Sequence, residues 1–172
     1  MTIVFHIVTA IGVTVILTDT AKIKPDAKII KGVFTGLAAF IVGLISHAAL
    51  DYSPHCYPAH SKIAAIVSLL IIITFLWVIK KPYKLIAGLS FLGCSLPDII
   101  DRGPAISKKL LGHGLPISDP IFPMHWHEYS GLIYYGECWF STINQIVLVL
   151  TIGIICWFRR ADLKRMIKYN KP

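Results

Sequence analysis

The stretch Ile29–His60 reads IIKGVFTGLAAFIVGLISHAALDYSPHCYPAH, and it combines an apolar segment with several ionisable residues. Its first part is apolar and long enough to cross a bilayer as a helix. A spacing of four places His47 and Asp51 on one face of that helix. Pro54 favours ending the helix, which leaves His55 at the start of a loop. Because ionisable groups near membrane depth are costly and indicate function, we predict a metal site or an acid–base site here.

The composition is typical of an integral membrane protein. Of the 172 residues, 55% are hydrophobic and 15% are charged, whereas soluble domains have about 25% charged residues. We therefore expect an all-α membrane protein with a single domain, residues 1–172. In a soluble protein the net charge of +8 would suggest nucleic acid. Here the basic residues flank apolar segments, which indicates membrane orientation and contact with lipid, and we expect no nucleic-acid partner.

Apolar segments in five places predict five transmembrane helices. They are Thr2–Leu17, Ile29–Leu50, Ile63–Ile79, Lys84–Pro97 and Leu132–Phe158. A long segment, Ile99–Glu128, separates the last two helices. It is too polar to cross a bilayer and too rich in proline and glycine to form one regular helix.

Basic residues are distributed unequally between the two ends of these helices. One end receives the lysines within residues 22–31 and 80–84 together with the basic tail that starts at Arg159. The other end receives only Lys62, Arg102, Lys108 and Lys109. By the positive-inside rule, we expect the N-terminus and the segment Ile99–Glu128 outside, and the C-terminus in the cytoplasm.

All seven histidines fall on the predicted outer side, together with several carboxylates. The candidate metal ligands among them are His6, His47, Asp51, His55, Asp98, His125 and His127. Imidazole and carboxylate suit Zn²⁺ first, with Mn²⁺ or Fe²⁺ as alternatives. A set of more than four such ligands can hold either one ion or two ions bridged by a carboxylate.

Two further residues are candidates for catalysis. Asp101 lies three residues after Asp98, so both carboxylates face one cavity if the helix continues past Pro97. His125 and His127 are two apart, which places both on one face of an extended segment. Glu128 follows them and is our candidate general base.

The four cysteines form no C-x-x-C pair, so a zinc finger or a thioredoxin-type site has no support. They are Cys56, Cys94, Cys138 and Cys156. Buried thiols that pack as small apolar groups are one interpretation. A disulfide from Cys138 to Cys56 or to Cys94 is the other, if the outer face is oxidising.

Two of these segments resemble motifs of a known family. The residues from His47 to His55 follow the pattern H-x-x-x-D-x-x-P-H, and those from Gly93 to Asp101 follow G-x-x-x-P-D-x-x-D. Both patterns resemble small bacterial membrane proteins classed as membrane-bound metal-dependent hydrolases, and His6 resembles the histidine in their first helix. The resemblance implies a divalent metal, a location in the bacterial cytoplasmic membrane, and phosphoester or lipid-linked substrates.

Our functional hypothesis is a metal-dependent hydrolase at the outer membrane surface, acting through metal-activated water on a phosphoester or lipid-linked substrate. The expected partners are membrane lipid and a small-molecule or lipid-linked substrate. Three alternatives stay open: a transporter or sensor of divalent metal, a b-type haem protein with His6 and His47 as axial ligands, and an assembly protein whose outer loop binds a partner.

Overall fold

The computed structural model describes residues 1–23, 29–57, 61–112, 116, 119–136 and 138–167. Within these ranges the chain is all-helical, as predicted, with no strand and only two isolated β-bridges. The helices are α1 (Ile3–Leu17), α2 (Ile29–Tyr52), α3 (Ser61–Val78), α4 (Lys81–Asp101), α5 (Gly103–Leu111), the short 3-10 helix η1 (Pro123–His125), α6 (Trp139–Phe158) and α7 (Arg160–Met166).

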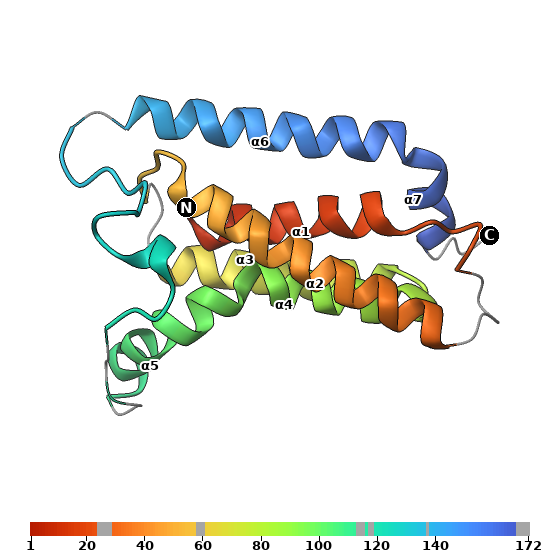
Figure 1. Cartoon of the computed structure of the whole chain (residues 1–172), viewed down its shortest axis with the longest axis horizontal. Coiled ribbons are helices and arrows are strands. Elements are labelled where there is room, and N and C mark those ends of the chain that lie inside the picture. The colour runs from red at the N-terminus through yellow and green to blue at the C-terminus, as the bar shows by residue number, and fades with distance from the viewer. Residues whose placement is uncertain (24–28, 58–60, 113–115, 117–118, 137, 168–172) are drawn as a thin grey trace.

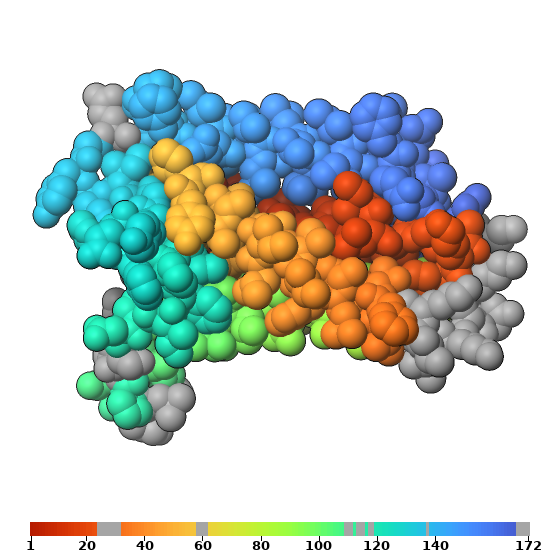
Figure 2. Space-filling view, in the orientation of Figure 1, coloured from red at the N-terminus to blue at the C-terminus, as the bar shows by residue number. Residues whose placement is uncertain are grey.

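Five long helices run along the length of the molecule, with α1 in contact with each of the other four (Figure 1). The core lies mainly between α1 and α4, where Ile7, Ala10 and Ile86 are fully buried. The space-filling view shows α2 and α6 forming much of one face, with α1 visible in the furrow between them (Figure 2). The start of α1, the ends of α2 and α4 and the segment 119–136 gather at one end of the bundle (Figure 1).

Among the residues that the structure describes, three helices are long and apolar enough to cross a membrane: Gly32–Tyr52 within α2, and the whole of α4 and α6. The segments Ile3–Leu17 and Lys62–Val78 are also apolar but shorter. The outward faces carry large apolar side chains, among them Phe34, Trp77 and Trp157, each at least two-thirds exposed. Exposing such a surface to water is unfavourable in free energy, whereas contact with lipid is not. The surface therefore supports the predicted class of membrane protein.

The helix ends differ from the prediction at α4 and α6. We expected a helix that ends at Pro97, but α4 continues to Asp101 with Pro97 inside it. Proline removes one backbone hydrogen bond, but α4 stays helical across Pro97 and packs against α2. The last long helix begins at Trp139 instead of Leu132, because Gly136, at φ +116°, adopts a conformation that a helix does not contain.

The long polar segment and the basic tail both contain short helices that the sequence pattern did not predict. Helix α5 has Pro104 in its first turn and ends at Leu111. Gly112 follows it, with a φ of +73° that is typical of the residue after a helix. Helix α7 packs at the opposite end of the bundle from the segment 119–136 (Figure 1). There the backbone amide of Lys80 donates to the carbonyl of Met166 at 2.8 Å.

Close backbone contact between α2 and α4 sets the position of the candidate site. A Cβ atom built on Gly93 would lie 2.2 Å from the carbonyl oxygen of Phe40, and one built on Gly43 would lie 3.0 Å from that of Ser90. Only glycine allows two helices to approach so closely. The contact brings the polar ends of α2 and α4 together.

Candidate metal centre

Four side chains from three elements meet at one end of the bundle. They are His47 and Asp51 from α2, Asp98 from α4 and His125 from η1, and each offers one ligand atom within 4.8 Å of the others. We call these four residues the cluster. His47 Nε2 lies 3.3 Å and His125 Nε2 lies 3.1 Å from Asp51 Oδ2. His125 Nε2 also lies 3.5 Å from Asp98 Oδ1, so the donor atoms converge.

Local structure explains why these side chains point inward. His47 and Asp51 are one turn apart on α2, as predicted. Asp98 reaches the cluster because α4 continues past Pro97. His125 is presented by the turn that Pro123 begins, and the 3-10 geometry of η1 leaves its side chain almost fully buried.

Each imidazole of the cluster is held by its other ring nitrogen. His47 Nδ1 donates to the carbonyl of Cys94 at 2.7 Å, and His125 Nδ1 donates to Asp101 Oδ2 at 2.7 Å. Asp101 is itself fixed, since it accepts the backbone amides of Ile121 and Phe122 at 2.9 and 3.0 Å. Metal-binding histidines commonly use such a partner to fix ring orientation and tautomer. The contacts of Asp101 are those of a residue that positions His125.

His55 has the same anchoring but stands beside the cluster. Its Nδ1 donates to the carbonyl of Ser53 at 2.8 Å, while its buried Nε2 has no hydrogen-bond partner among the described residues. Burial lowers the pKa of His55 to about 4, so the ring is neutral at neutral pH. Its backbone pairs with the segment that follows η1, through the carbonyl of Gly131 at 2.9 Å. A neutral, buried and unpaired imidazole nitrogen is available as a ligand.

Asp51 divides its two oxygens between two groups of partners. Oδ2 faces His47 and His125, whereas Oδ1 lies 3.1 Å from His6 Nε2 and also contacts the amino group of Met1. The His6 ring stacks on that of His47, with the ring centroids 4.1 Å apart. The two rings lie face to face, which differs from the haem alternative, in which their nitrogens would face each other across an iron ion.

His127 and Glu128 are not brought into the cluster. We expected an extended segment that places His125 and His127 on one face, but residues 123–129 form the 3-10 helix and a turn. His127 therefore points away from the cluster and is exposed, with its ring stacked on Tyr134 at 4.4 Å. Glu128 is exposed in the same turn. A role of His127 as ligand or of Glu128 as general base would require this turn to move.

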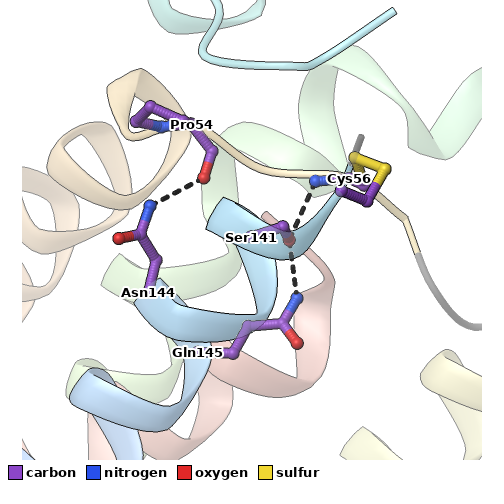
Figure 3. The surroundings of a disulfide bond; sticks show 6 residues. Pro54, Cys56, Ser141, Asn144 and Gln145 are labelled. Atoms are coloured by element: carbon purple, nitrogen blue, oxygen red, sulfur yellow. Dashed lines mark hydrogen bonds between the residues drawn. A yellow bond between two sulfur atoms is a disulfide. The ribbon is translucent and has the colours of Figure 1, made fainter. Parts of the chain in front are cut away.

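A disulfide ties the loop that carries His55 to the start of α6. Of the two expected pairings, the structure has Cys56–Cys138 (Figure 3). Cys94 is free and buried. Around the disulfide, Ser141 Oγ accepts the amide of Cys56 at 3.0 Å and Asn144 Nδ2 donates to the carbonyl of Pro54 at 2.8 Å (Figure 3). These contacts hold the loop after α2 against α6.

Sequence reasoning missed Arg102 and Tyr57 as neighbours of the cluster. Arg102 Nε lies 3.2 Å from Asp98 Oδ1, and its guanidinium carbon lies 5.7 Å from the centre of the Tyr57 ring. Arg102 follows Asp98 by four residues, so helical spacing would have shown the pair once the helix was extended past Pro97.

The donor set fits a divalent metal. Two imidazole nitrogens with fixed orientation and two carboxylates are ligands typical of Zn²⁺, Mn²⁺ or Fe²⁺. His60 and His113 lie outside the described residues. Searches among protein-family models, curated proteins and solved structures found no match to this chain.

Proposed function

We propose that this protein is a membrane-embedded, metal-dependent hydrolase that acts on a phosphoester or a lipid-linked substrate. The observation that carries the proposal is the convergence of His47, Asp51, Asp98 and His125, with both imidazoles anchored through Nδ1. These four residues would hold the ion, with Zn²⁺ as our first choice. A bound divalent ion supplies Lewis-acid activation of water and of a phosphoryl oxygen.

The residues around the cluster have separate parts in this proposal. Asp101 fixes the ring of His125, so the geometry of the site is set before any ligand binds. His6 lies 3.1 Å from Oδ1 of Asp51 and would orient that carboxylate, whereas the buried, unpartnered Nε2 of His55 would be available to a second ion. The substrate class rests on the resemblance to membrane-bound metal-dependent hydrolases.

We also propose that the site faces the non-cytoplasmic side of a bacterial cytoplasmic membrane. In this topology all five long helices span the bilayer, with the N-terminus outside and the basic C-terminus in the cytoplasm. The distribution of lysine and arginine supports it. The Cys56–Cys138 disulfide supports it as well, because it lies at the cluster's end of the bundle and disulfides persist on oxidising sides of membranes.

Elemental analysis of the detergent-purified protein tests the metal site. We expect stoichiometric zinc, manganese or iron in the wild type, and its loss in His125→Ala. His127→Ala is the matched control, because it removes an exposed imidazole only two residues away. Equal metal content in both variants would contradict the assignment, as would a wild-type protein that binds no metal after reconstitution.

Activity is tested separately from metal binding. The loaded protein is given a soluble phosphomonoester and vesicles that contain phosphatidic acid, and release of inorganic phosphate is measured. Hydrolysis that is absent from His47→Ala supports the enzyme. Metal uptake into proteoliposomes without any hydrolysis would instead favour the transport alternative.

A further inference from the structure

The cluster is most accessible to solvent on the side of Asp98. The side chain of Asp98 is 16% exposed, whereas those of His47, Asp51 and His125 are at most 2% exposed. A molecule that reaches the cluster from the end of the bundle therefore meets Asp98 first. The groups next to Asp98 on this side determine what the site admits.

Arg102 is the cationic side chain that stands at this opening. Its Nε lies 3.2 Å from Asp98 Oδ1, and the same oxygen lies 3.5 Å from His125 Nε2. One carboxylate oxygen of the cluster thus lies between the guanidinium and the His125 ring. The Tyr57 ring lies under the guanidinium carbon at 5.7 Å, and Arg102 keeps 38% of its side chain exposed.

Arg102 retains unused hydrogen-bonding capacity. Its Nε lies within ion-pair distance of Asp98 but makes no hydrogen bond, and neither terminal nitrogen donates one to any residue that the structure describes. A guanidinium that served only to neutralise Asp98 would gain most by turning its paired terminal nitrogens to the carboxylate. Instead the terminal nitrogens remain available beside a cluster that we propose to hold a cation.

We propose that Arg102 is the residue that binds the phosphoryl anion of the substrate at the opening of the site. The inference rests on the proposed metal-dependent function and deepens it, since it selects a phosphoryl ester over a neutral ester. Arginine is suited to this role because its planar donors match two oxygens of one phosphoryl group. Asp98 and the Tyr57 ring hold the side chain, so binding costs little side-chain entropy.

Binding of inorganic phosphate to the zinc-loaded protein, measured by titration calorimetry, tests the proposal. We expect Arg102→Gln to weaken phosphate binding by about tenfold to a hundredfold, as the loss of charge-assisted hydrogen bonds implies. Arg102→Lys should recover only part of the affinity. Arg159→Gln is the matched control, since Arg159 is 35% exposed and lies 3.2 Å from Asp162 at the other end of the bundle.

Zinc content is measured on the same samples, so failure of the metal site is seen independently. If Arg102→Gln keeps both its zinc and the phosphate affinity of the wild type, the proposal is wrong. It is also wrong if the wild type binds no phosphate in either the zinc-loaded or the metal-free state. Two substrate arms identify the source of the phosphoryl group: a selective rise of KM for p-nitrophenyl phosphate indicates a soluble ester, and one for phosphatidic acid in vesicles indicates a lipid.

Discussion

Gly93→Ala should separate α2 from α4 and weaken the metal site. The added Cβ would lie 2.2 Å from the carbonyl oxygen of Phe40, and both groups belong to helix backbone that cannot rotate away. The helices would have to move apart by about 1 Å or more to reach ordinary van der Waals separation. Overpacking of this kind costs about 1–3 kcal/mol, which exceeds the gain of up to about 1 kcal/mol when alanine replaces glycine in a helix.

The movement has a direct path to the ligands. The carbonyl that anchors His47 Nδ1 at 2.7 Å belongs to Cys94, the residue after Gly93. We therefore expect a lower thermal unfolding midpoint in detergent together with weaker zinc binding, measured by competition with a chromogenic chelator. Both effects should appear in the same variant, because they share one cause.

Gly88→Ala is the control for this experiment. Gly88 lies on the same helix, but a Cβ built on it meets nothing within 4 Å among the described residues. This variant should keep its zinc affinity and be as stable as the wild type or slightly more so. If Gly93→Ala behaves like Gly88→Ala in both assays, the close approach of α2 and α4 is not what positions the site.

Three further predictions concern the surroundings of the cluster. Asp101→Asn should lower zinc affinity by about 10- to 100-fold in chelator competition, because the charged partner of the His125 ring is lost. Replacing both Cys56 and Cys138 by serine should lower the free energy of unfolding by about 2–4 kcal/mol, given their sequence separation of 82 residues. The unfolding midpoint of this variant should not respond to reductant. A variant with the same midpoint as the wild type would argue against the disulfide. In the metal-free protein, burial lowers the pKa of His55 from 6.5 to about 4. As the pH falls, His55 is protonated in the unfolded chain before it is protonated in the folded protein. The free energy of unfolding therefore decreases as the pH falls from 6.5 toward 4. His55→Asn should flatten this part of the pH profile of the unfolding midpoint.

Periodicity was sufficient to predict the parts of the site that lie on regular helix. The spacing of His47 and Asp51 led directly to their contact at 3.3 Å. Asp98 and Asp101 were predicted to face one cavity if the helix passed Pro97, and both contact opposite nitrogens of the His125 ring. Positions three and four residues apart have fixed relations on any α-helix, so no tertiary information is needed.

The choice between His125 and His127 could not be predicted in the same way. It depends on whether the segment is extended or turned, and η1 is only three residues long. The turn is stabilised from outside, by Asp101 accepting the amides of Ile121 and Phe122. Those contacts span about twenty residues of sequence, a separation at which local pattern carries no information.

The start of α6 was missed for a related reason. The segment 132–138 is apolar enough to extend the helical pattern, but Gly136 adopts a positive φ and Cys138 is bonded to Cys56. The disulfide and the pairing of His55 with Leu132 hold this segment beside the loop after α2. Tertiary constraints therefore override the hydrophobic pattern here.

The anchoring of two imidazoles by main-chain carbonyls has a consequence for tracing distant relatives of this protein. His47 and His55 each donate through Nδ1 to a peptide oxygen, that of Cys94 and that of Ser53. Any amino acid supplies such an oxygen, so substitution of Cys94 or Ser53 can preserve the orientation of the rings. Position 94 must only stay small, because Cys94 is buried in the core. A motif search would thus recover the histidines, while the carbonyls that orient His47 and His55 leave no signature in an alignment.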